Sequence, residues 1–173
     1  MIRGAAIAVV ALFLAGSLPG GDVSTVAEVW IFTAVDCPIA NGYAPEMTRL
    51  RDDYDAKQVK FVLVYSEPSV TAEEIRAHRS DYALTLPAVH DPLHRRVRKA
   101  GATTTPEVAV FNRDDQLVYR GRIDDRYTEF GDRRSQPTET YLRDVLDRLV
   151  SGEEIEFHST EPIGCFIEAL SEN

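Results

Sequence analysis

Residues 29–38 read VWIFTAVDCP, and this stretch decides the fold. The run Val29–Val35 is apolar throughout, as expected of a strand that is buried on both faces of a sheet. Asp36 ends the run, and Cys37 and Pro38 follow where a stretch with helical spacing of apolar side chains begins. Proline is favoured in the first turn of a helix, where its missing N–H group is not needed. We therefore predict a buried strand, then a cysteine, then a helix.

The rest of the chain continues this alternation. The expected strands after the first are residues 59–65, 87–90, 107–111 and 117–123, with a short one at 155–157, and the expected helices are 38–56, 71–84, 92–99 and 138–150. Strands linked by helical crossovers predict a parallel core, and the late strand pair predicts an added antiparallel hairpin. The fold class is therefore α/β, with a central mixed β-sheet flanked by helices on both faces.

Three segments are expected to depart from this regular alternation of strands and helices. Pro45 lies inside the first helix and is expected to kink it or to mark its true start. Residues 124–138 are polar and are expected to form a loop, with Asp124 and Asp125 as solvated turn residues. The final 20 or so residues form a tail that carries the second cysteine.

The N-terminus has the pattern of a secretory signal peptide. Arg3 precedes a short apolar run, and small residues follow the run as far as residue 21. The run is too short for a spanning helix, which needs about 20 apolar residues. We expect residues 1–21 to be removed on export to the periplasm or outside the cell, and residues 22–173 to form one domain without stable membrane insertion.

Composition narrows the possible partners. The chain has 173 residues, a net charge of −9 and two cysteines, Cys37 and Cys165. An acidic chain is unsuited to nucleic acid, which binds clustered Lys and Arg. Two cysteines are too few for a four-thiolate zinc site but enough for one disulfide or one redox pair. The four histidines are scattered, and we take them as surface or loop residues, so we expect no metal and no cofactor.

Cys37 is the candidate nucleophile. A sulfur at a helix start faces unpaired backbone N–H groups and the positive end of the helix dipole, and both favour the thiolate. Asp36 opposes this, because an adjacent carboxylate disfavours a second negative charge. A second element is Thr105-Pro106, which stands just before a strand, where a proline can form a cis bond in a tight turn.

Together these elements resemble the thioredoxin superfamily, and more closely its redoxin branch of peroxiredoxin-like proteins related to alkyl hydroperoxide reductase. The resemblance covers about residues 28–167. It rests on the strand that ends in Cys-Pro, on GATTTPEVAVF at 101–111, on GRIDD at 121–125 and on EPIGCFI at 161–167. It implies a thioredoxin-like fold, Cys37 in the attacking position, and Thr105-Pro106 as the cis-proline loop that faces it.

The chain departs from the family pattern in its cysteines. Ala40 and Ala34 stand where a second cysteine of a Cys-x-x-Cys motif would be, and Ala34 also replaces the threonine of peroxiredoxins. The remaining partner is Cys165, which is distant in sequence. If the two approach each other, Cys37 attacks a peroxide or a disulfide, and Cys165 resolves the product.

Two functions remain open. The first is an exported thiol redox protein that uses Cys37 and Cys165 as catalytic residues, while Pro38, Thr105 and Pro106 shape the site and hold the substrate backbone. Its partner would be a thiol or disulfide redox protein or a small peroxide. The second is a non-catalytic interaction domain of the same fold, in which a Cys37–Cys165 disulfide only ties down the tail.

Overall fold

A computed structural model describes residues 25–129 and 131–170 of the chain. The expected leader, residues 1–21, lies outside the described residues. No helix in the described ranges is long and apolar enough to cross a membrane.

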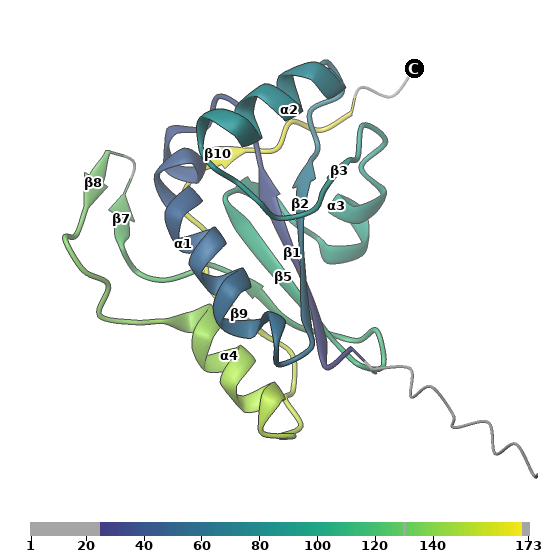
Figure 1. The fold of residues 1–173 in the computed structure, drawn as a ribbon, viewed down its shortest axis with the longest axis vertical. Helices are drawn as coiled ribbons and strands as arrows, with labels where there is room; N and C mark the ends of the chain where they lie inside the picture. The colour runs from purple at the N-terminus through teal and green to yellow at the C-terminus, as the bar shows by residue number, and fades with distance from the viewer. Residues whose placement is uncertain (1–24, 130, 171–173) are drawn as a thin grey trace, which may run out of the picture.

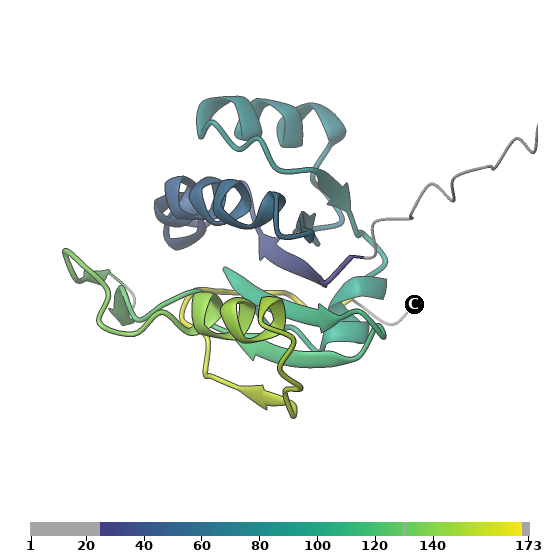
Figure 2. The same cartoon turned by 60° about the horizontal axis from the view of Figure 1, so that its bottom comes forward.

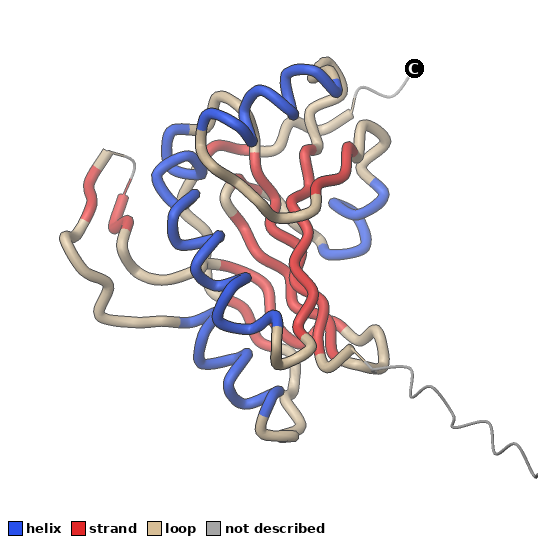
Figure 3. The backbone as a smooth tube through the Cα atoms, in the orientation of Figure 1, coloured by secondary structure: helices blue, strands red, loops and turns tan. Residues whose placement is uncertain are grey.

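The centre of the molecule is a six-stranded mixed sheet (Figures 1 and 3). Its strands, in spatial order, are β3 (Ala88–His90), β2 (Val59–Tyr65), β1 (Ala27–Thr33), β5 (Glu107–Asn112), β6 (Leu117–Gly121) and β9 (His158–Ser159). β1 pairs in parallel with β2 and antiparallel with β5, and β5 and β6 form an antiparallel hairpin. The parallel core with an added hairpin is therefore confirmed.

Within the described residues, four helices cover the sheet: α1 (Pro38–Asp55), α2 (Ala72–Asp81), α3 (Arg95–Ala100) and α4 (Tyr141–Val150). The central strand β1 explains why both faces need cover. Val29 and Ile31 join a large core with side chains of α1, α2 and α4, whereas Trp30 and Phe32 join a smaller core with α3. Successive side chains of a strand point to opposite faces, so a continuous apolar run requires two apolar layers. The expected α/β class, with helices on both faces, is confirmed.

Two local predictions differ from the structure. α1 begins at Pro38 and continues through Pro45 as one helix, so Pro45 does not mark its start. The region 124–138 is not all loop, because β7 (Tyr127–Glu129) and β8 (Asp132–Arg133) form a small hairpin that projects from the body of the molecule in Figures 1 and 2.

Several polar side chains that were expected in solvent are buried. Asp124 accepts a hydrogen bond from the Tyr43 hydroxyl, and Asp125 accepts the backbone N–H groups of Thr138 and Glu139. The hydrogen-bonding groups that these carboxylates satisfy come from distant parts of the chain, so their burial was not visible in the local pattern. His78 and His94 are likewise buried rather than at the surface.

The C-terminal segment makes two short pairings. The strand expected at 155–157 is found slightly later, as β9, which pairs in parallel with β6 at the edge of the sheet. Further along, β10 (Cys165–Phe166) pairs antiparallel with β4 (Thr104–Thr105) in a separate two-stranded sheet. This second pairing brings the tail to the carboxyl end of β1, where α1 begins.

Candidate active site

Cys37 is the N-cap residue of α1. β1 ends at Thr33, and a short turn then places Cys37 in an extended conformation in front of the helix. Its Sγ accepts the backbone N–H of Ala40 at 3.5 Å, and Pro38 occupies the first turn. The sulfur thus meets one of the N–H groups that a helix start leaves without a partner in the helix. The Cys37 side chain is completely buried.

The cis-proline loop faces Cys37 directly. The Thr105–Pro106 peptide bond is cis, as expected, and the Thr105 carbonyl oxygen accepts a hydrogen bond from the Cys37 thiol at 2.9 Å. The two groups are 68 residues apart in sequence. They meet because β1 and β5 are antiparallel neighbours, with Phe32 opposite Glu107.

The tail brings the second cysteine to the same place. Cys165 is the register partner of Thr105 in the β4–β10 ladder, and the Thr105 hydroxyl donates to the Cys165 carbonyl at 3.4 Å. One residue beyond the ladder, the Ile167 N–H donates to the Thr103 carbonyl at 2.9 Å. Both cysteines therefore gather at Thr105, and both are free thiols in this structure.

Gly164 allows the tail to come this close. A Cβ atom at position 164 would lie 2.0 Å from the Thr105 carbonyl oxygen and 3.1 Å from the Pro106 nitrogen. Only a residue without a side chain can pack its backbone directly against this peptide bond. The glycine is therefore part of the site geometry, and it stands beside Cys165 for a steric reason.

The environment keeps Cys165 protonated. Burial, the neighbouring Cys37 thiol and the negative charge of Asp36 together raise the pKa of Cys165 to about 12, with burial as the largest cause. A neutral thiol is a weak nucleophile. At neutral pH, Cys165 is thus a proton-bearing neighbour of Cys37 rather than a ready attacking group.

A cavity of about 250 Å³ opens beside the cysteines. It is lined by Ala34, Asp36, Ser66, Glu67, Pro68, His94, Thr105, Cys165, Phe166, Ile167 and Glu168. Cys165 is among the lining residues, whereas Cys37 is completely buried and is not among them. Of the two sulfurs, Cys165 is the one that borders the open space.

Glu107 supports the cis-proline loop from inside the protein. Its carboxylate accepts the backbone N–H groups of Thr103 and Thr104 at 2.7 and 3.1 Å, and it pairs with Arg120 at 3.2 Å. The residue is only 1% exposed. Burial raises the pKa of the Glu107 carboxyl, while the donated hydrogen bonds and Arg120 act in the opposite direction.

A second buried network supports the helix start. The His78 ring lies between the Tyr65 hydroxyl, 2.8 Å from Nδ1, and the Asn41 side-chain oxygen, 2.7 Å from Nε2. Asn41 in turn donates to the carbonyl of Val35, two residues before Cys37. Because the amide oxygen only accepts, Nε2 donates to Asn41. Burial lowers the pKa of His78 and so favours the neutral ring, in which Nδ1 accepts from the Tyr65 hydroxyl.

Most of the site residues predicted from the sequence lie close together in the structure. The structure brings Cys37, Cys165 and Thr105 together, and Pro38 lies at the adjacent helix start. Pro106 lines a different, small cavity and is not among the residues that line the cavity beside Cys165.

Glu107, Gly164 and His78 were not predicted as part of the site. The one sequence signal for them was that Glu107 and Gly164 lie directly beside Pro106 and Cys165.

Comparison with known proteins supports the fold. No model of a protein family matches the sequence, and no curated protein matches it. Among solved structures, an uncharacterized conserved protein from Geobacillus kaustophilus is 27% identical, with a TM-score of 0.73 over 87% of this chain and 80% of that one.

Two further solved structures are similar to this chain in fold. A putative thioredoxin from Neisseria meningitidis is 17% identical, with a TM-score of 0.56 over 75% of this chain and 78% of that one. A putative thiol:disulfide interchange protein from Chlorobium tepidum is 13% identical, with a TM-score of 0.53 over 75% and 80% of the two chains. At these identities the likeness concerns the fold. The chain therefore has a thioredoxin-like fold, as the resemblance around Cys37 and Pro106 implied.

Proposed function

We propose that this protein is a thiol–disulfide oxidoreductase that uses Cys37 as its nucleophile and Cys165 as the partner in one reversible disulfide. One observation carries the proposal: the β4–β10 pairing sets Cys165 opposite Thr105, whose carbonyl oxygen accepts the Cys37 thiol. Two thiols that converge on one residue from positions 37 and 165 are placed for two-electron exchange. The names of the fold's relatives agree with this chemistry.

The proposed reaction proceeds in two exchanges. The Cys37 thiolate attacks one sulfur of a partner disulfide, a mixed disulfide forms, and the second partner sulfur leaves as a thiolate that takes up a proton. Cys165 then loses its proton and attacks the Cys37 sulfur, so that the Cys37–Cys165 bond forms and the first partner sulfur leaves. The protein is oxidised by two electrons, and the partner disulfide becomes two thiols.

Thr105, Pro106 and Pro38 would border the partner's backbone at this site. The tail covers the edge of β4 that an extended partner chain would need, since Phe166 and Thr104 are paired there. Only two residue pairs form this ladder, and Phe166 is 86% exposed. Ile163 and Ile167 pack against the two cores, but the backbone pairing that holds the tail is short. Release of the tail is therefore a feasible first step for a large partner.

A small peroxide is the second candidate substrate, and the complete burial of Cys37 favours it over a large partner. In that case the Cys37 thiolate attacks one peroxide oxygen, the other oxygen leaves as water or an alcohol, and a sulfenic acid remains. Cys165 then condenses with the sulfenic acid, and the Cys37–Cys165 disulfide and water are the products. An external dithiol returns the protein to its reduced form.

Comparison of Cys37→Ser with Cys165→Ser tests the proposal. The wild-type protein should oxidise rapidly with a small disulfide or hydrogen peroxide and should show one intramolecular disulfide by mass spectrometry. Cys37→Ser should lose most of this rate. Cys165→Ser should still react once and should accumulate a mixed disulfide or a sulfenic acid.

The non-catalytic alternative predicts a different outcome. If Cys37 and Cys165 form a purely structural bond, the oxidised protein should resist reduction by an excess of dithiothreitol in the folded state, and reduced Cys37 should react no faster than a free cysteine. That result would contradict the proposed activity and would assign the pair to tail anchoring.

Export and domain organisation are part of the same proposal. We propose that residues 1–21 act as a cleaved leader and that residues 22–173 form one domain with a C-terminal tail, on the strength of the apolar run after Arg3. An oxidising compartment would let the disulfide persist. Mass analysis of the protein recovered from an exporting host should show a new N-terminus near residue 22.

A further inference from the structure

We propose that the cavity beside Cys165 selects cationic substrates, namely small disulfides that carry a basic group next to the sulfur. This inference rests on the proposed function, because it names the substrate class of the same site. It concerns the charge of the preferred substrate, because thiol–disulfide exchange by itself does not select between cationic, neutral and anionic disulfides.

The charge on the cavity wall is one-sided. Three carboxylates line the cavity, those of Asp36, Glu67 and Glu168, and its lining residues include no Lys or Arg. The remaining titratable side chain besides Cys165 is His94, which is buried with Nε2 2.8 Å from the Ser66 carbonyl, so this nitrogen is occupied.

These carboxylates are not neutralised by neighbours. Elsewhere in the described chain, several carboxylates have arginine partners, as Glu107 has Arg120. Within residues 25–129 and 131–170, neither Asp36, Glu67 nor Glu168 forms an ion pair. All three side chains are exposed, so their field extends into the cavity mouth.

Phe166 adds a surface that suits the same class of ligand. It lines the cavity and is 86% exposed, the highest value among the large hydrophobic side chains of the described chain. An ammonium or guanidinium group is attracted to the face of an aromatic ring, and the alkyl part of Lys or Arg packs against it. The ring and the three carboxylates, which lie beside the Cys165 thiol, therefore match a basic group that adjoins a sulfur.

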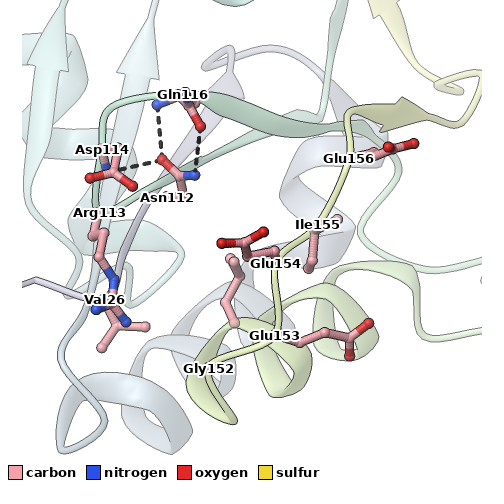
Figure 4. A pocket seen from close by; sticks show the side chains of 11 residues that line it. Val26, Asn112, Arg113, Asp114, Gln116, Gly152, Glu153, Glu154, Ile155 and Glu156 are labelled. Atoms are coloured by element: carbon pink, nitrogen blue, oxygen red, sulfur yellow. Dashed lines mark hydrogen bonds between the residues drawn. The ribbon is translucent and has the colours of Figure 1, made fainter.

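A second acidic cavity supplies the control (Figure 4). Glu154 and Glu156 line a cavity of about 610 Å³ together with the turn between β5 and β6. Ala27, at the start of β1, pairs with Asn112 of that cavity, whereas Cys37 follows the other end of β1. The two cavities lie at opposite ends of the sheet, so only one of them adjoins the thiols.

The experiment measures how fast three small disulfides oxidise the reduced full-length protein. Cystamine carries two positive charges, bis(2-hydroxyethyl) disulfide is neutral, and 3,3′-dithiodipropionate carries two negative charges. Because these reagents differ in intrinsic reactivity, each rate is compared between wild type and variant rather than between reagents. The test variant is Glu67→Gln/Glu168→Gln, and the matched control is Glu154→Gln/Glu156→Gln.

We expect the test variant to react with cystamine about threefold or more slowly than wild type, and with dithiodipropionate faster by a similar factor, at low salt. The neutral disulfide should change less than twofold, and the control variant should match wild type with all three reagents. The effects should shrink at high salt, because exposed charges are screened.

Two other results have separate meanings. If the test variant changes all three rates equally, or if the control variant gives the same shifts, the charge selection is wrong while the thiol chemistry stands. If none of the three disulfides oxidises the wild-type protein through Cys37, the proposed function fails and the inference fails with it. Asp36 is kept unchanged in the test variant, because it adjoins Cys37 and its replacement would alter the surroundings of the nucleophile as well as the charge of the cavity.

Discussion

Thr105 connects both cysteines at the scale of single residues. Its carbonyl oxygen accepts the Cys37 thiol, its backbone is the register partner of Cys165, and its hydroxyl donates to the carbonyl of Cys165. The Ala40 N–H donates to the same sulfur, so the Cys37 thiol donates one hydrogen bond and accepts another.

The buried ring of His78 leads to a pH prediction. Burial lowers its pKa in the folded state, so below about pH 6.5 the unfolded chain binds a proton that the folded protein does not. The free energy of unfolding should therefore fall as the pH drops from 7 towards 5.5. Urea unfolding of wild type and His78→Gln should show a smaller pH dependence in the variant, and equal slopes would contradict the prediction.

Glu107 leads to a stability prediction. Glu107→Ala leaves the N–H groups of Thr103 and Thr104 without their acceptor and removes the buried carboxylate that pairs with Arg120. Loss of one partner of a buried network of this kind costs about 3 to 5 kcal/mol. Chemical denaturation should show a loss of this order for Glu107→Ala and a smaller one for Glu107→Gln, which keeps an acceptor oxygen. Exposed Glu73→Ala serves as the control and should stay near wild type.

At the scale of elements, the short ladder between β4 and β10 determines access to the site. Two paired residues and one further N–H bond hold the tail against the loop before Pro106. The ladder is small compared with β1–β2, in which seven residue pairs lie in register. The segment that we expect to cover Cys37 is thus, by its backbone pairing, among the more weakly held elements of the fold, and such elements open most readily.

Gly164→Ala should release this cover. The added Cβ would collide with the Thr105 carbonyl, and a backbone atom cannot move aside as a flexible side chain can. We expect iodoacetamide to alkylate Cys37 at least several times faster in Gly164→Ala than in the parent, both measured in a Cys165→Ser background. Phe166→Ser is the control, since that side chain is already 86% exposed and its loss should not change the rate. Equal rates in all three proteins would refute the covering role.

At the scale of the whole molecule, the Cys37–Cys165 pair spans most of the domain. A disulfide between these positions closes a loop of about 128 residues, and this restricts the unfolded chain by about 4 to 5 kcal/mol in the loop-entropy model. The oxidised protein should therefore unfold at a higher denaturant concentration than the reduced one. Cys165→Ser should show no such difference between oxidising and reducing conditions; a difference that persists in the variant would have another source.

The sequence predicted the fold well because its signals are local. The apolar run of Val29–Val35, the helical spacing after Cys37 and the turn before Leu117 each depend on neighbouring residues, so strand and helix periods can be read directly. The predicted α/β class agrees with the structure for this reason. The prediction was wrong where a partner outside the local segment determines whether a side chain is buried. Asp125 is an example, because its carboxylate accepts the N–H groups of Thr138 and Glu139.

By itself, the sequence determined the order of the elements, the position of Cys37 at a helix start and the proline that follows Thr105. Only the tertiary structure decided that Cys165 lies beside Cys37, that Cys37 is completely buried, and that three carboxylates without ion-pair partners in the described residues line the cavity beside Cys165. The physical reason is that the β4–β10 pairing joins segments about 60 residues apart. Such a pairing depends on the backbone hydrogen bonds and close packing of the folded chain rather than on a local period.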